Sequence, residues 1–150
     1  MSDENKTIAR KLFEDAWNRG QLETLDTIVA GDCRFHDPVF PSMASGADSL
    51  RKHIRMYRNA FPDLNYAIDD IIAERNEVVV HWTMHGTHRQ SFLSMAPTNR
   101  TASISGTTIN RIVDKRIAEQ WSDWNLLSLM EQLGLASAPG RETATATVRR

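Results

Sequence analysis

The sequence has a single cysteine, Cys33, no long apolar run and almost no net charge. One cysteine excludes an intrachain disulfide and a cage of thiolate metal ligands. No apolar stretch approaches the roughly 20 residues that a membrane-spanning helix needs, and the N-terminus opens with polar residues. A formal net charge of −1 provides no basic footprint for nucleic acid or an anionic membrane. We therefore expect a soluble, cytoplasmic protein with no nucleic-acid or membrane partner.

Motifs that mark several common enzyme classes are also missing. The chain has no glycine-rich phosphate loop, no nucleophile elbow and no internal repeat. His81, His85 and His88 lie close together in the sequence, but residues four apart on a strand are separated by roughly 13 Å, too far to share one ion. The sequence therefore predicts no metal site.

The stretch from Thr101 to Trp124 is typical of two long β-strands joined by a polar turn at Asp114-Lys115. Its isoleucines alternate with serine and threonine, a composition that suits a pleated, half-buried surface. Gly106 lies inside the first of these strands, where a glycine usually marks a bulge or a sharp bend. We therefore expect a strongly curved sheet with one concave face, on which a small molecule can be held.

The rest of the chain predicts an α+β fold in which three N-terminal helices cover one face of a curved antiparallel sheet. The third helix is expected to begin at Ser45 and Asp48, which together resemble a capping box. We expect one domain over residues 1–135, and a disordered tail over 136–150 because that segment has almost nothing to bury. The elements are expected at 4–19, 22–29 and 45–61 for the helices, at 33–37, 65–74 and 77–87 for further strands, and at 125–133 for a closing helix.

Short motifs in a fixed order resemble one protein family. They are Ala60-Phe-Pro-Asp63, Gly86-Thr-His88, Ala96-Pro-Thr98, Ser105-Gly106, Arg111-Ile112, Ile117-Ala-Glu119 with Trp121, and Gln132-Leu-Gly134. Over most of residues 5–134 the chain resembles the SnoaL-like polyketide cyclase (ester cyclase) family, which has the nuclear-transport-factor-like fold. The resemblance implies a conical α+β barrel of the cystatin/SnoaL-like type with a hydrophobic cavity, a homodimer, and an enzyme that needs no cofactor.

The same resemblance places the expected catalytic residues on the long hairpin. Members that close aromatic polyketide rings use a His and an Asp on its two strands, and these positions hold Thr108 and Ser122 here. Neither hydroxyl acts as a base near neutral pH without help. Asn125 also replaces the Asp usually seen at the end of the second strand. The chain therefore resembles the family in scaffold and departs from it at the catalytic positions.

Two other residues are candidates for the missing base. Asp123 is the nearest carboxylate to the vacated position, and a local bulge could turn it inward, whereas regular alternation sends it to the opposite face. His36 lies at the end of the first strand, and histidine is a residue type that commonly serves as a general base. The alternative for His36-Asp37 is a structural turn in which Asp37 bonds nearby backbone groups before Pro38.

Several further residues are candidates for binding a substrate. Trp124 and Gln120 share the parity of Ser122, so we expect them on the concave face. Trp82 and Tyr57 provide large rings that could line the cavity, with core or dimer packing as the alternative. Asp37 and His88 are polar candidates, and His88 has a structural hydrogen bond as its alternative role.

Three functions remain open at this point. The first is an enzyme of the cyclase, isomerase or hydroxylase type that moves a proton at a carbon next to a carbonyl of a small apolar, polyketide-like substrate. The second is a ligand-binding or accessory protein whose catalytic pair has been replaced by Thr108 and Ser122. The third is a structural dimerisation domain. A solidly packed cavity would exclude the first two.

Overall fold

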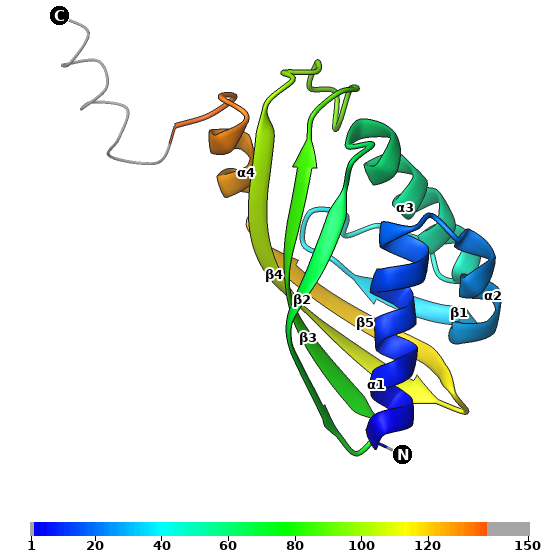
Figure 1. Ribbon diagram of the computed structural model, residues 1–150. Helices are drawn as coiled ribbons and strands as arrows, with labels where there is room; N and C mark the ends of the chain where they lie inside the picture. The colour runs from blue at the N-terminus through cyan, green and yellow to red at the C-terminus, as the bar shows by residue number, and fades with distance from the viewer. Residues whose placement is uncertain (1, 138–150) are drawn as a thin grey trace, which may run out of the picture.

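In the computed structural model, which describes residues 2–137, five strands form one curved, unclosed sheet (Figure 1). The strand order is β1-β5-β4-β3-β2, and all neighbours are antiparallel except β1 and β5. The strands are β1 (Val29–His36), β2 (Asn65–Glu74), β3 (Glu77–Thr87), β4 (Thr101–Val113) and β5 (Arg116–Trp124). The predicted α+β fold is confirmed, and the sequence did not predict that β1 would add a parallel edge strand.

The β4–β5 hairpin has the bounds that the sequence predicts. Asp114 and Lys115 form its turn, and both have positive φ, as the tight turns that suit twisted strands require. Of the two alternatives predicted at Gly106, the bulge is excluded, because Gly106 keeps its register with both Trp82 and Trp124, and the predicted curvature of the sheet is confirmed (Figure 1). The irregularity of this hairpin lies between Arg111 and Ile112 instead.

The N-terminal helix changes its geometry midway. The α-helix α1 (Ser2–Lys11) continues into a π-helical segment, η1 (Leu12–Asn18). The wider turn brings neighbouring as well as four-apart side chains to the buried side, and such turns are frequent at functional sites. The buried residues of η1 are Leu12, Phe13, Ala16 and Trp17.

The second helix is shorter than predicted. A 3₁₀ turn, η2 (Leu22–Thr24), leads into α2 (Leu25–Ile28), and the chain is already extended at Val29, which pairs with Ile117 of β5. The β-branched side chain of Val29 packs well in a strand, which is why β1 begins there rather than at Cys33. Cys33 is fully buried in β1.

The predicted capping box at Ser45 is wrong. The third helix, α3 (Ala47–Ala60), begins after Gly46, which caps it without a side-chain hydrogen bond. Gly46 has a φ of 98°, and a Cβ atom there would lie 2.7 Å from the carbonyl oxygen of Gly31. Only glycine fits this position, so backbone geometry rather than a serine sets the start of α3.

The helices cover one face of the sheet and leave the other largely bare (Figure 1). Figure 1 shows α1, α2 and α3 on the same side of the sheet, while α4 (Leu126–Gln132) packs by itself along β4. Asn125 caps α4 by accepting a hydrogen bond from the N–H of Ser128. Within the described residues no helix is long and apolar enough to cross a membrane. The predicted tail lies outside them, apart from its first two residues.

Candidate functional site

A small cavity lies between the concave face of the sheet and the helices that cover it. Its volume is about 40 Å³, which is room for a few water molecules. Sites that enclose a drug-sized ligand hold roughly 300–1,000 Å³, so a ring system enters this cavity only if wall side chains move. The walls are formed by Phe13, Trp17, Phe35, His36, Asp37, Met43, Leu50, His53, Tyr57, Tyr66, Trp82, Met84, Ile104, Thr108, Gln120, Ser122 and Trp124.

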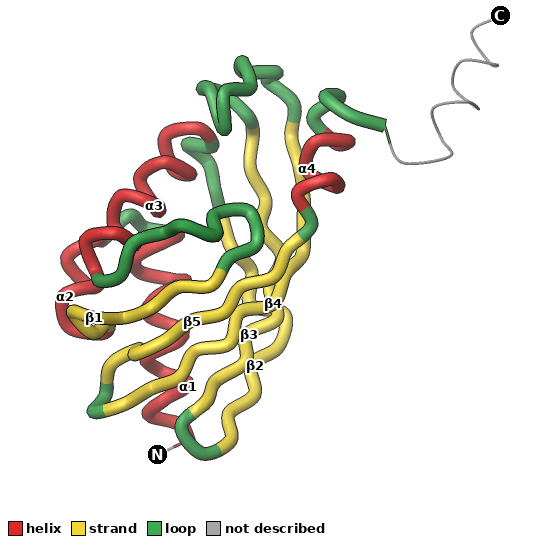
Figure 2. The backbone as a smooth tube through the Cα atoms, turned by 180° about the vertical axis from the view of Figure 1, so that it is seen from behind, coloured by secondary structure: helices red, strands yellow, loops and turns green. Residues whose placement is uncertain are grey.

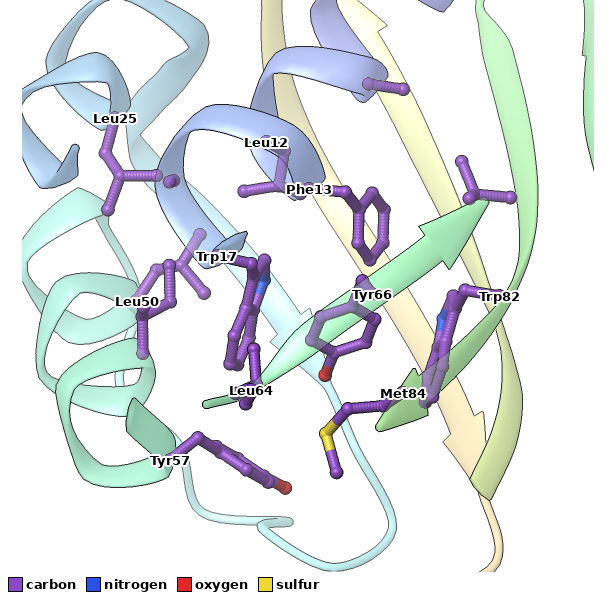
Figure 3. Close-up of a cluster of buried hydrophobic side chains, with 14 of the residues drawn as sticks. Leu12, Phe13, Trp17, Leu25, Leu50, Tyr57, Leu64, Tyr66, Trp82 and Met84 are labelled. Atoms are coloured by element: carbon purple, nitrogen blue, oxygen red, sulfur yellow. The ribbon is translucent and has the colours of Figure 1, made fainter. Parts of the chain in front are cut away.

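Aromatic rings from three elements converge in the wall, as Figure 3 shows for Trp17, Tyr57 and Tyr66. The ring centre of Trp17 lies 5.4 Å from that of Tyr57 and 5.0 Å from that of Tyr66. Burial raises the pKa of both tyrosines, so their hydroxyls stay protonated at neutral pH. Neither hydroxyl has a hydrogen-bond partner among residues 2–137, which leaves two O–H donors for a ligand.

Thr108 and Ser122 both line the cavity and form a chain of hydrogen bonds with Trp82. The indole Nε1–H of Trp82 donates to Oγ1 of Thr108 over 2.9 Å, and Oγ1 of Thr108 lies 3.0 Å from Oγ of Ser122. An indole N–H only donates, so Thr108 must accept from Trp82. The two hydroxyls share one proton between them, and the other remains for the cavity. The pair is therefore a hydrogen-bond donor toward a ligand.

Asp37 brings a carboxylate to this hydroxyl pair from the neighbouring strand. His36 is the last residue of β1 and pairs with Trp121, so Asp37 follows in register beside Ser122. Its carboxylate accepts hydrogen bonds from the backbone N–H of Val39 over 2.9 Å and from Nε1–H of Trp124 over 3.3 Å. Burial raises the pKa of Asp37 above its usual value, and these hydrogen bonds oppose the shift only in part. The expected bond from Asp37 to nearby backbone is thus present, and the same carboxylate also lines the cavity.

Gln120 faces the cavity next to Asn110. Its Nε2 donates to Oδ1 of Asn110 over 2.7 Å, which leaves the carbonyl oxygen of Gln120 as an acceptor on the wall. Asn110 is fully buried, and its Nδ2 has no hydrogen-bond partner within the described part of the chain. This amide pair adds further polar groups to the wall that already carries Thr108, Ser122 and Asp37.

His53 is a cavity residue that the sequence analysis missed. It lies on α3 one turn before Tyr57, and its ring packs edge-on against Phe40 at 4.7 Å and against Tyr57 at 5.0 Å. Burial lowers the pKa of His53 to about 4, so its imidazole is neutral at neutral pH. Its place among the apolar residues of α3 could have revealed it, because a histidine four residues before a buried tyrosine shares the same helix face.

The two residues proposed as the base from the sequence, Asp123 and His36, have their polar groups mainly on the outer face of the sheet. Asp123 is exposed and does not line the cavity, as regular alternation predicts. His36 borders the cavity, but its Nε2 lies 2.6 Å from Oε2 of Glu119 and its ring stacks on Trp121 at 5.3 Å. The His36 hydrogen bond, followed by that of Arg111, lowers the pKa of Glu119. The imidazole of His36 is thus occupied on the outer face.

His88 lies outside the cavity wall and holds the loop between β3 and β4. It is fully buried, and its Nδ1 accepts a hydrogen bond from the backbone N–H of Thr98 over 3.3 Å. The structural alternative therefore describes its observed contacts. Among residues 2–137, no group of three potential ligand side chains is placed to hold a metal ion.

The predicted residues that the structure brings together around the cavity are Thr108, Ser122, Gln120, Trp124, Trp82, Tyr57, Asp37 and, at its border, His36. Regular alternation along β5 accounts for Gln120, Ser122 and Trp124 sharing one wall. The sequence missed Tyr66 and His53 as wall residues, since helix and strand periodicity alone could not show which apolar faces leave a gap.

Comparisons with known proteins agree with this architecture. The family model described as SnoaL-like polyketide cyclase matches residues 7–133. TsrD from Streptomyces laurentii superimposes with a TM-score of 0.83 at 24% identity, covering 91% of this chain and 98% of TsrD. AclR from Streptomyces galilaeus, provisionally named a hydroxylase, gives a TM-score of 0.79 at 25% identity, with 91% and 100% covered. IdmH from Streptomyces antibioticus, provisionally named a polyketide cyclase, gives 0.77 at 26% identity, with 87% and 98% covered. No curated protein sequence matches the chain.

Proposed function

Because the chain belongs to the SnoaL-like polyketide cyclase family, we propose that it moves a proton at a carbon next to the carbonyl of a small, mostly apolar substrate. The reaction needs no cofactor in this proposal. One observation carries it, namely that the carboxylate of Asp37 and the hydroxyl pair of Thr108 and Ser122 line the same cavity. A base and a set of oxygen-binding donors are the two parts that such a reaction requires.

Asp37 is the base in this proposal. It takes the place of the Asp that the family carries at position 122, from the adjacent strand rather than the same one. A carboxylate whose pKa is raised by burial is a stronger base than an ordinary aspartate, which favours its taking a proton from carbon. The proton passes from the substrate carbon to the Asp37 carboxylate, and the electron pair of the broken C–H bond moves onto the carbonyl oxygen.

The hydroxyl groups hold that oxygen while it gains negative charge. The proton left over on the Thr108–Ser122 pair is available to a ligand in the cavity, and the hydroxyls of Tyr57 and Tyr66 provide two further donors. Donors placed before the reaction stabilise an enolate more than the neutral ketone, because the charge develops only during proton transfer. The enolate then attacks an electrophilic carbon, as in ring closure, or takes the proton back from Asp37.

The proposal can be tested with 2-tetralone, a bicyclic ketone with protons next to its carbonyl. The protein is incubated with the ketone in D₂O at neutral pH, and NMR follows exchange of these protons. Asp37→Asn should reduce the protein-catalysed exchange by about 100-fold or more, as expected for loss of a general base. Asp123→Asn is the matched control, since it removes the neighbouring outer-face carboxylate, and should leave the rate unchanged.

The outcomes separate the candidate functions. If Asp123→Asn abolishes exchange and Asp37→Asn does not, the assignment of the base is wrong. If 2-tetralone binds without any catalysed exchange, the protein is the ligand-binding alternative, which the hydroxyls at positions 108 and 122 favour. Binding is measured independently by quenching of tryptophan fluorescence.

We also propose a homodimer formed through the outer face of the sheet. An apolar row crosses four strands there, because Ile72 is paired with Val79, Val79 with Ile109, and Ile109 with Trp121, and the row ends at the ring of His36 on β1. Ile72 is 57% exposed, and a row of this length on a bare face favours burial against a second copy. In sedimentation analysis, Ile109→Glu should shift the protein to a monomer, whereas Ser105→Glu, an exposed position on β4 opposite Thr83 and away from the row, should not. A wild-type monomer at high concentration would contradict the proposal.

A further inference from the structure

We propose that an outer groove next to the cavity forms the second half of the ligand site and binds the apolar body of a ligand that carries an anionic group. This inference rests on the proposed function and names the substrate class: a ring system with a carbonyl at one end and a carboxylate or other anionic oxygen at the other. The groove is lined by Phe40, Met43, Ser49, Lys52, His53 and Met56, among others.

The size of the two spaces supports this division. The inner cavity holds about 40 Å³, whereas the outer groove holds about 400 Å³, which lies within the range of ligand sites. Met43 and His53 line both spaces, so the wall between them is one side chain thick. A ligand that places its carbonyl at Ser122 therefore continues past this wall into the groove.

The segment from Pro38 to Ser45, which we call the β1–α3 loop, forms this wall. It makes few backbone hydrogen bonds to other parts of the chain, so it can move. Figure 2 shows it leaving the end of β1 and turning back toward α3. Its backbone N–H groups bond within the loop or to Asp37, as Phe40 does to the carbonyl of Asp37 and Met43 to that of Phe40. The first bond to another part of the described chain is that of Gly46 with Cys33.

Apart from the bonds to Asp37 at its start, side-chain packing holds the loop over the cavity. The ring of Phe40 lies 4.7 Å from that of His53 and 6.2 Å from that of Tyr57. Lifting the loop breaks these ring contacts, and the only backbone hydrogen bonds that tie residues 38–45 to the rest of the described protein are those to the adjoining Asp37. An apolar ring from a ligand can replace the ring of Phe40 against His53, which offsets the cost of opening.

Lys52 determines the charge of the ligand in this inference. Among the described residues that line the groove it alone is charged at neutral pH, because burial lowers the pKa of His53 to about 4. Lys52 is exposed and forms no ion pair or hydrogen bond with residues 2–137. An apolar groove with one unpaired cation fits an apolar molecule with one negative charge.

Two probes of the same shape test the groove. Anthraquinone-2-carboxylate and 2-(hydroxymethyl)anthraquinone share three rings and two carbonyls, and they differ in charge. Neither has a C–H bond on a saturated carbon next to its ring carbonyls, so binding is measured without turnover, by quenching of tryptophan fluorescence. The wild-type protein should bind the carboxylate probe more tightly than the alcohol probe. Added salt should weaken binding of the carboxylate probe only.

Lys52→Gln should weaken binding of the carboxylate probe about two- to fivefold, which is the effect expected for loss of an exposed ion pair. Binding of the alcohol probe should be unchanged. Lys115→Gln, at the turn between β4 and β5, is the control and should change neither. Ser49→Trp fills the groove and should weaken both probes about tenfold or more. Its thermal melting curve checks that it folds, and Lys52→Gln provides the test if it does not.

Equal binding of the two probes, or unchanged binding of both in Lys52→Gln and Ser49→Trp, would overturn the inference. The proposed catalysis fails separately, when 2-tetralone exchange is insensitive to Asp37→Asn. If anthraquinone binding depends on Lys52 while 2-tetralone exchange is absent, the groove is supported as a ligand site and the proposed catalysis is rejected.

Discussion

The indole ring of Trp82 occupies the space that a side chain at Gly106 would need. A Cβ atom at position 106 would lie 2.5 Å from Cη2 of Trp82 and 2.8 Å from the carbonyl oxygen of Asp123. Gly106 is therefore required for the close approach of a ring, not for a bulge. With the ring lying flat over the neighbouring strand, Nε1 of Trp82 reaches Oγ1 of Thr108.

Gly106→Ala should destabilise the fold by about 1–3 kcal/mol, because the added methyl group forces either the indole or the β5 backbone to move. Gly31→Ala is the matched control, since Gly31 also lies in a strand and a Cβ atom there has nothing within 4 Å. Urea unfolding of both variants measures the difference. Equal stability changes in the two would contradict the proposed packing of Trp82.

The hydrogen bond between Trp82 and Thr108 can be measured with a double-mutant cycle. Trp82→Phe removes the N–H, Thr108→Val removes the acceptor, and the coupling between them should be about 1 kcal/mol. The cycle of Trp121→Phe with Thr108→Val is the control, because Trp121 lies on the outer face, and its coupling should be near zero. A coupling near zero in the first cycle would mean that Trp82 does not orient the hydroxyl.

His53 should make stability depend on pH. Its pKa is lowered from 6.5 to about 4, so the unfolded chain binds more protons than the folded one between these values. The stabilising effect of neutral His53 is complete above pH 6.5 and is lost as the pH falls toward 4. Relative to His53→Phe, the wild type should lose about 2–3 kcal/mol of unfolding free energy between pH 7 and pH 4.5.

Urea unfolding of the two proteins at both pH values provides this comparison, with His81→Gln on the outer face as the control. A wild type and a His53→Phe variant with the same pH dependence would show that His53 is not shielded from water.

Local patterns predicted those parts of the fold that local chemistry determines. Alternation of isoleucine with serine and threonine predicted β4 and β5 with their turn, and the runs around Tyr66 and Val80 predicted β2 and β3. The predicted start of α3 was wrong because the true start depends on the close approach of Gly46 to the carbonyl oxygen of Gly31, which is a contact between distant parts of the chain. The parallel pairing of β1 with β5 is also long-range and has no local signature.

The candidate site was predicted only as far as local patterns along single strands determine it. Strand parity placed Gln120, Ser122 and Trp124 together, and it also gave Asp123 its outer position as one of two alternatives. To predict Asp37 beside Ser122 one must know the register of β1 against β5. To predict His53 in the wall one must know how α3 packs over the sheet. Neither can be derived from spacing along one element.

The pH dependence of 2-tetralone exchange tests the role of Asp37 most directly. The wild-type rate should rise with pH and level off above an apparent pKa that is higher than the usual 3.8 of an aspartate, since burial raises the pKa of Asp37. This inflection should be absent in Asp37→Asn and unchanged in Asp123→Asn. An inflection that persists in Asp37→Asn would contradict the account.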